Sequence, residues 1–187
     1  RVRREDFVPA DSRALAFADA ELPIGHGERM MKPVLEGRLL QALAVQEGDS
    51  VLEIGTGSGF VTACLAALAR DVTSVEIHAD LAASAEQKLT RAGVANTRVH
   101  VADALKGYAP GRSFDAIAVT GAVYHEPEQL RSWLAVGGRM FLVRGESPVM
   151  EAVLITRTGD SSFREESLFE TDLPYLTHAA PPKRFVL

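Results

Sequence analysis

The nine residues Val51-Leu52-Glu53-Ile54-Gly55-Thr56-Gly57-Ser58-Gly59 decide the fold of this chain. An apolar run typical of a buried strand opens the stretch, and three glycines at alternate positions end it. Because glycine has no Cβ atom, such a backbone can turn sharply and pass close to a ligand. The stretch therefore predicts a strand, a turn that cradles a ligand, and a helix after the turn.

Short apolar runs alternate with helical patterns on the C-terminal side of this turn, which is typical of βαβ units with a parallel sheet. The predicted strands are residues 51–54, 72–77, 97–101, 114–119 and 139–143, the predicted helices are 61–70, 80–91 and 126–134, and Gly137-Gly138 is expected to form the turn into the last strand. Two further runs, 149–156 and 167–171, predict an antiparallel hairpin at the sheet edge. The predicted fold class is α/β, with a doubly wound, mostly parallel, Rossmann-like sheet and a C-terminal antiparallel hairpin.

The N-terminal part of the chain is expected to cover this sheet. Pro33 suits the first turn of a helix that carries Leu35, Leu39 and Leu43 at a spacing of four. The preceding stretch, 21–27, is turn-rich, and we expect it to form a loop near the mouth of the ligand cleft.

Spacing and charge in the glycine turn separate the candidate ligands. A dinucleotide fold has glycines at the first, third and sixth positions, whereas here the sixth position is Phe60, so the spacing disfavours NAD. Glu53 would repel a pyrophosphate but suits the cationic amino-acid end of S-adenosylmethionine. The glycines flank Ser58 directly, which also disfavours a hydrolase nucleophile elbow. The predicted cofactor is therefore S-adenosylmethionine.

Carboxylates also end the next two predicted strands. Glu76 could accept hydrogen bonds from both ribose hydroxyls, and Asp103 could accept one from the exocyclic amine of adenine. The alternative for Asp103 is a cap on the following turn, and the alternative for Glu53 is a contact inside the fold. No pair of His, Cys or carboxylate residues has convincing ligand spacing, so no metal site is predicted.

Length and charge bound the organisation of the chain. With 187 residues we expect a single domain, 1–187, in which a loop and helix in 1–48 cover the cleft and 49–187 form the cofactor-binding core. The net charge of −5 comes from carboxylates spread along the chain. A nucleic-acid groove is not indicated, because the only dense basic cluster comprises Arg1, Arg3 and Arg4.

Hydrophobicity and cysteine content indicate the environment of the protein. No apolar run approaches the roughly 20 residues that span a bilayer, so we expect no membrane segment. Cys64 is the sole cysteine, which excludes a disulfide framework within the chain, and we expect it to be buried and not nucleophilic. A cytoplasmic protein is expected, and the missing initiator Met predicts a trimmed N-terminus.

The chain resembles the protein-L-isoaspartate O-methyltransferase family, and several matching pieces lie outside the general methyltransferase motif. These pieces are residues 4–9, 22–27, 51–60, 75–77, 114–120 and 134–139. The resemblance implies methyl transfer from S-adenosylmethionine to the side-chain carboxylate of isoaspartyl residues in damaged proteins or peptides, with S-adenosylhomocysteine as product.

The resemblance also implies site residues. The expected cofactor contacts are Glu53, Gly55, Thr56, Gly57, Gly59, Glu76, Ile77, Asp103 and Ala104, and Thr120 is expected beside the reacting centre. His26, His125 and Tyr124 are further candidates for the acceptor side, with surface or half-buried positions as the alternative.

One departure from the family bears on catalysis. The family has a Thr-Ile-Ser run before the proline, and here Arg29, Met30 and Met31 precede Lys32 and Pro33. Met31 therefore stands at the position of a Ser hydroxyl near the transferred methyl, and it donates no hydrogen bond. Losing one neutral hydrogen bond lowers a rate roughly threefold to tenfold. Two alternatives follow: a methyltransferase of the same fold with a different acceptor, or a cofactor-binding module without catalysis.

Overall fold

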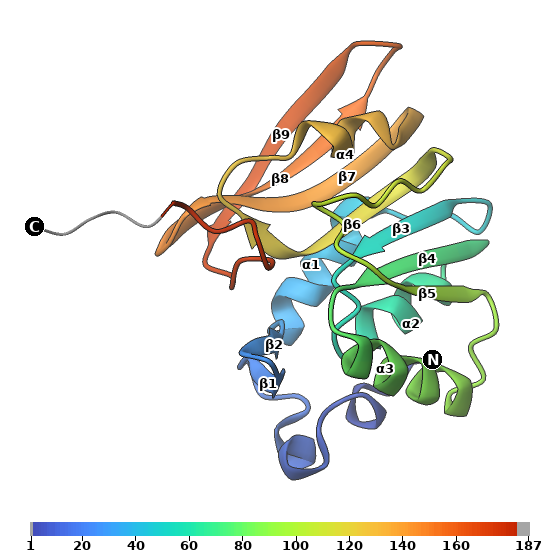
Figure 1. Ribbon diagram of the computed structural model, residues 1–187, viewed down its shortest axis with the longest axis vertical. Helices are drawn as coiled ribbons and strands as arrows, with labels where there is room; N and C mark the ends of the chain where they lie inside the picture. The colour runs from blue at the N-terminus through green and yellow to red at the C-terminus, as the bar shows by residue number, and fades with distance from the viewer. Residues whose placement is uncertain (1, 183–187) are drawn as a thin grey trace, which may run out of the picture.

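The computed structural model describes residues 2–182; Arg1, part of the predicted basic cluster, and residues 183–187 lie outside the described residues. A seven-stranded sheet forms the centre (Figure 1). Across the sheet the strands follow the order β5 (Thr97–Val101), β4 (Asp71–Glu76), β3 (Ser50–Ile54), β6 (Phe114–Val123), β7 (Leu134–Glu146), β8 (Val149–Arg157) and β9 (Phe163–Thr171).

Strand pairing confirms the predicted fold class. β3 pairs in parallel with β4 and β6, β4 pairs in parallel with β5, and β6 pairs in parallel with β7. β8 and β9 then add antiparallel neighbours, as the hairpin prediction requires. The chain runs from β3 outward to β5 and returns on the other side of β3 as β6, so the strand order switches between β3 and β6. Ligands of open α/β sheets bind at such a switch point, beyond the carboxyl ends of the strands.

Helices cover both faces of the sheet because apolar side chains emerge on both. α1 (Pro33–Leu43) and α2 (Phe60–Ala66) pack on one face through residues such as Leu39 and Leu65, next to Ala118 of β6. α4 (Glu128–Ser132) packs on the other face through Leu130, next to Ile117. α3 (Ala79–Arg91) lies against β4 and β5.

The structure corrects three expected boundaries. α2 ends at Ala66, before the predicted end at residue 70, and α4 is five residues long because the chain enters β7 at Leu134. Gly137 and Gly138 lie inside β7, not ahead of it, at a register shift opposite β6. A Cβ atom on Gly138 would lie 2.9 Å from the carbonyl oxygen of Phe114, so the bulge itself requires glycine there.

The expected loop at 21–27 is an antiparallel hairpin of β1 (Leu22–Gly25) and β2 (Glu28–Met30). Gly25, His26 and Gly27 all have positive φ, which allows the chain to reverse tightly between the two strands. Two short 3-10 helices, η1 (Arg4–Asp6) and η2 (Ala10–Leu15), precede the hairpin. Buried Arg4 anchors this segment through an ion pair with Glu36 of α1, at 2.8 Å.

After β9 the chain returns to the switch point, which the sequence did not predict. This segment, residues 172–179, is called the C-terminal strap. The amide of Ala122 donates to the carbonyl of Pro174, and the amide of Leu176 donates to the carbonyl of Ala122. Figure 1 shows the strap and the β1–β2 hairpin at the end of the sheet to which β3 points. No helix in the described part of the chain has the length and apolar character needed to cross a membrane.

Candidate functional site

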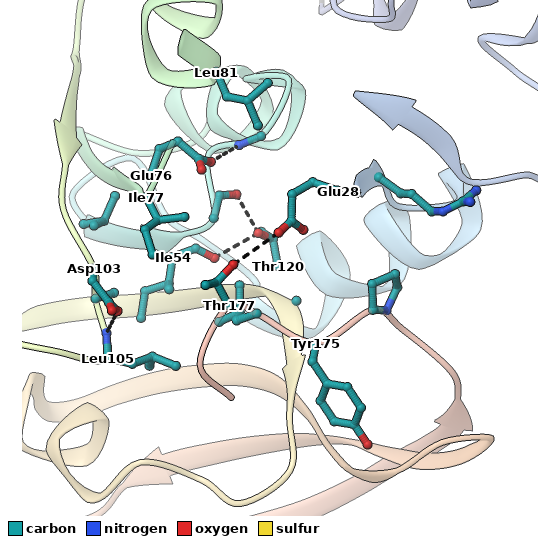
Figure 2. Close-up of a pocket in the computed structure, with 18 of the residues that line it drawn as sticks. Glu28, Ile54, Glu76, Ile77, Leu81, Asp103, Leu105, Thr120, Tyr175 and Thr177 are labelled. Carbon is teal, nitrogen blue, oxygen red and sulfur yellow. Dashed lines mark hydrogen bonds between the residues drawn. The ribbon is translucent and has the colours of Figure 1, made fainter. Parts of the chain in front are cut away.

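A cleft with about 690 Å³ of empty space lies at the carboxyl ends of the central strands and is called the main cleft. Glu76 lines it from the end of β4, Gly55 and Asp103 line it from just after β3 and β5, and Thr120 lines it from the point of β6 where the ladder with β3 ends. The β1–β2 hairpin and the C-terminal strap line it from the opposite side (Figure 2). The main cleft therefore occupies the switch point, where the fold places a ligand.

Two of the three glycines in the turn face this cleft. Gly55 has φ +95°, and a Cβ atom there would lie 2.4 Å from Oγ1 of Thr120. Gly57, with φ +52°, lines the cleft as well. Gly59 does not line it: a Cβ atom on Gly59 would lie 3.1 Å from the Cβ of Ala85 in α3. Gly59 therefore allows close helix packing, and the expected cofactor contact at this residue has no geometric support.

Glu76 closes the glycine turn from the neighbouring strand tip. Its Oε2 accepts a hydrogen bond from the amide of Gly57 at 2.8 Å, and its Oε1 accepts one from the amide of His78 at 3.0 Å. Carboxylate oxygens have further lone pairs, so Glu76 can still accept hydrogen bonds from a ligand. Ile77 lies beside it as an apolar wall of the main cleft.

Asp103 lies at another end of the main cleft, followed by Ala104 and Leu105, which also line it. Its Oδ1 accepts a hydrogen bond from the amide of Leu105 at 2.9 Å, and its Oδ2 lies 2.7 Å from Nδ1 of His178. Asp103 therefore caps the following turn and lines the cleft at the same time, so the two interpretations are compatible.

The structure corrects the expected role of Glu53. Its side chain is 0% exposed and does not line the main cleft; Oε2 accepts hydrogen bonds from Thr62 and Ser74. Burial raises the pKa of Glu53 to about 8, so this carboxyl is mostly neutral at pH 7. Thr56 is hydrogen-bonded to Ser74 and does not line the main cleft either. Glu53 and Thr56 thus support the turn from inside the fold, as the alternative for Glu53 proposed.

A second, smaller cavity adjoins the main cleft and is called the acceptor-side cavity. Thr120 and Gly55 line both spaces, and buried Met31 lines only the smaller one. The structure therefore brings Thr120 and Met31 to one cavity. The hydroxyl of Thr120 lies 2.9 Å from the carbonyl of Ile54 and 2.6 Å from that of Gly55, so its proton is directed at the β3 tip.

The other candidates lie outside both cavities. His26 stacks on His78 with ring centroids 4.1 Å apart and lies 2.9 Å from Asp80. His125 is exposed and contacts the half-buried Tyr124. Cys64 is half-buried, and burial raises the pKa of its thiol to about 12, which disfavours a nucleophile. Among residues 2–182 no group of three or more His, Cys, Asp or Glu side chains is placed to hold a metal ion.

Sequence reasoning missed several residues that line the main cleft. They are Glu28, Arg29, Leu81, Leu105, Gly121 and residues 173–177. The only available signal was the turn-rich stretch before Pro33, and Ile24 confirms its expected position beside the cleft. No local pattern marks the strap as part of the site.

A glycine turn at the switch point, with acids at two neighbouring strand tips, defines the class of Rossmann-like, S-adenosylmethionine-dependent methyltransferases. The model of the family described as protein-L-isoaspartate(D-aspartate) O-methyltransferase matches residues 1–177. The chain belongs to this family.

Similar proteins agree with this assignment. The protein-L-isoaspartate O-methyltransferase 1 of Rhodopseudomonas palustris is 38% identical over 169 residues, which are 90% of this chain and 69% of the relative. The enzyme of the same name from Magnetococcus marinus is 41% identical over 165 residues, 88% of this chain and 72% of the relative. A Plasmodium falciparum structure is described as a beta-aspartate methyltransferase in complex with S-adenosyl-L-homocysteine. It is 21% identical to this chain with a TM-score of 0.79, and the match covers 94% of this chain and 86% of the Plasmodium chain. This last comparison shows the shared fold.

Proposed function

We propose that this protein transfers the methyl group of S-adenosylmethionine to the carboxylate of isoaspartyl residues in damaged proteins or peptides. The methyl moves from sulfur to a carboxylate oxygen, which leaves S-adenosylhomocysteine and a methyl ester. The observation that carries the proposal is the main cleft at the switch point, joined through Thr120 to the acceptor-side cavity, in a chain of this family. One space suits the cofactor, and the other suits the acceptor.

The residues of the main cleft fit the cofactor. Acidic and apolar side chains line the cleft together, and a Cβ at Gly55 would fill part of it. We assign adenine to Asp103 and Ala104, the ribose hydroxyls to the carboxylate of Glu76 with Ile77 as an apolar wall beside the ribose, and the amino-acid end to Gly55 and Gly57. The bound cofactor supplies an electrophilic methyl group on a positively charged sulfur.

The protein contributes mainly alignment and exclusion of water. A carboxylate acceptor is already ionised near neutral pH, so no general base is required. Thr120, whose hydroxyl proton is directed at backbone carbonyls, forms part of the wall between the two spaces and offers its lone pairs to them. Buried Met31 gives the acceptor-side cavity an apolar wall, which strengthens electrostatic interactions inside it.

The same proposal includes the organisation of the protein. Residues 1–48 supply the hairpin and α1 that cover the site, and 49–187 supply the cofactor-binding core of a single domain. The proposed partner is a protein or peptide, with no role for nucleic acid or membrane, in the cytoplasm. The scattered charge and the single cysteine support this assignment.

Met31 favours a second candidate, a methyltransferase of the same fold with a different acceptor. A thioether in place of a hydroxyl changes both the polarity and the shape of the acceptor-side cavity. A module that binds the cofactor without catalysis is the third candidate, and it makes a separate experimental prediction.

The test is methyl transfer from labelled S-adenosylmethionine to an isoaspartyl peptide, with the aspartyl peptide of the same sequence as control. The proposal expects a base-labile methyl ester on the isoaspartyl peptide alone. Binding of S-adenosylhomocysteine without this ester overturns the isoaspartyl proposal, and labelling of other acceptors in a cell extract then supports the second candidate. No heat of binding for either form of the cofactor in calorimetry overturns all three.

A further inference from the structure

One acidic residue of the main cleft has no role in the assignments above. The charged residues that line the cleft are Glu28, Arg29, Glu76 and Asp103. Glu53, expected to bind the cationic amino-acid end of the cofactor, is enclosed by Thr62 and Ser74. We propose that Glu28 performs this task, with its carboxylate binding the ammonium group of the cofactor. The inference rests on the proposed function.

The order of the strands places Glu28 at the correct end of the cleft. Going across the sheet, the cleft is lined by Asp103 after β5, Glu76 at the end of β4, Gly55 after β3 and Thr120 of β6. With adenine and ribose at the first two, the amino-acid end falls at Gly55 and Thr120. Figure 2 shows Glu28, in contact with Thr177, away from the side of the cleft where Asp103 lies.

Hydrogen bonding leaves Glu28 the most available of the three acids. Both oxygens of Glu76 accept backbone amides, and both oxygens of Asp103 have partners as well. Oε1 of Glu28 lies 3.4 Å from Oγ1 of Thr177 and 3.7 Å from Nε2 of His78. Oε2 of Glu28 has no hydrogen-bond or ion-pair partner within residues 2–182. A carboxylate oxygen in this position can accept a hydrogen bond from an ammonium group.

The surroundings of Glu28 also strengthen such a contact. Its side chain is 30% exposed, between the hairpin and the strap, so water screens its charge less than at the open surface. Glu53 contributes little competing charge, because burial raises its pKa to about 8. Of these two acids, Glu28 is the one that lines the cleft, whereas Glu53 is enclosed within the fold.

The test compares two ligands by calorimetry: S-adenosylhomocysteine, and 5′-methylthioadenosine, which has the same nucleoside and sulfur but lacks the amino-acid end. In Glu28→Gln we expect the dissociation constant of S-adenosylhomocysteine to rise roughly 10- to 100-fold, the usual range for a lost charged hydrogen bond. The dissociation constant of 5′-methylthioadenosine is expected to change by less than about twofold, because this ligand has no ammonium group for Glu28 to bind. Equal losses for both ligands, or no loss for either, overturn the assignment of Glu28.

Controls separate this inference from the proposed function. Glu21→Gln changes an acid close to the hairpin that does not line the main cleft, and it should alter neither dissociation constant. Glu28→Asp keeps the charge and should retain part of the preference for S-adenosylhomocysteine, which also serves if Glu28→Gln fails to fold. If the unaltered protein binds neither ligand, the proposed function falls together with the inference. If it binds both and the Glu28 variants do not distinguish them, only the inference falls.

Discussion

The two walls of the main cleft are built from different kinds of structure. The strand-tip wall, formed by Gly55, Glu76, Asp103 and Thr120, continues the backbone ladder of the parallel sheet: the amide of Gly55 donates to the carbonyl of Val75 at 2.8 Å. The outer wall is formed by β2 and the C-terminal strap.

The strap is hydrogen-bonded to the backbone of Ala122 in β6, and β2 pairs with β1, but the strap and β2 contact each other through side chains. The hydroxyl of Tyr175 donates to the carbonyl of Gly145 at 2.9 Å, and Thr177 contacts Glu28 across the gap between strap and hairpin. Ladder hydrogen bonds are cooperative with the whole sheet, whereas no backbone hydrogen bond joins the strap to β2 within the described residues 2–182. Changes to the backbone of the strand-tip wall should therefore weaken binding strongly, and changes to the contact between strap and hairpin should only adjust it.

The largest effect is expected for Gly55→Ala in the strand-tip wall. The new Cβ would lie 2.4 Å from Oγ1 of Thr120, and the residue has φ +95°, so either the turn or Thr120 must move. Strain of about 2–3 kcal/mol weakens binding of S-adenosylhomocysteine about 100-fold, as measured by calorimetry. Gly111→Ala is the matched control, because Gly111 has φ +69° and no atom within 4 Å of the added Cβ. If both variants bind S-adenosylhomocysteine equally well, the strand-tip wall can rearrange around an added Cβ, and the proposed difference between the two walls is wrong.

The largest effect on stability, as distinct from ligand binding, concerns the buried acid beneath the strand-tip wall. The pKa of Glu53 is raised from 4.5 to about 8, chiefly because burial disfavours its charged form. Between these two values the folded chain retains a proton that the unfolded chain has released, so stability falls as pH rises. Glu53→Gln removes this term, and its free energy of unfolding relative to the unaltered protein should rise by about 1.4 kcal/mol per pH unit in that window.

Urea unfolding at pH 5, 6, 7 and 8 measures this difference. Glu47→Gln, at an exposed position before β3, is the matched control for the substitution itself. A pH-independent difference for Glu53→Gln would mean that the carboxyl is ionised in the folded protein and that the strand-tip wall rests on a buried charge.

Local sequence carried most of the information about the strand-tip wall. The apolar run, the glycines and the acids at successive strand ends are features of neighbouring residues, and Gly55, Glu76 and Asp103 all line the cleft. The error at Glu53 has a physical cause. Every residue of β3 is buried, because helices cover both faces of the sheet, so polar and apolar positions do not alternate and the pattern cannot show which way a side chain points.

The outer wall could not be predicted from local patterns. Thr177 and Glu28 are 149 residues apart in sequence, and their contact depends on the strap reaching β6. Glu28 itself lies in a hairpin that appeared only as a turn-rich stretch. Contacts of this kind follow from the completed fold and not from the spacing of neighbouring residues.

A smaller effect is expected at Met31, the residue directly after β2 of the outer wall. Met31→Ser restores a hydroxyl at the acceptor-side cavity, and one additional hydrogen bond to the acceptor carboxylate should raise isoaspartyl methylation roughly threefold to tenfold. Losing the buried thioether lowers the stability of the fold, so the assay should be run well below the melting temperature of the variant. Met31→Leu keeps the volume without adding a hydroxyl and should change the rate by less than about twofold. A decrease in Met31→Ser would indicate an acceptor that requires the apolar wall.

The smallest effect is expected for Thr177→Val, which removes the contact between strap and hairpin while preserving the shape of the side chain. At 3.4 Å the contact with Glu28 is longer than a usual hydroxyl hydrogen bond, so the dissociation constant of S-adenosylhomocysteine should change by less than about threefold in calorimetry. Thr90→Val, on the exposed face of α3, is the control for the substitution itself. Since no backbone ladder joins Thr177 to Glu28, the strap and the hairpin can shift independently after this change. A tenfold loss of affinity would instead show that the outer wall closes as one rigid unit, and the contrast between the two walls would fail.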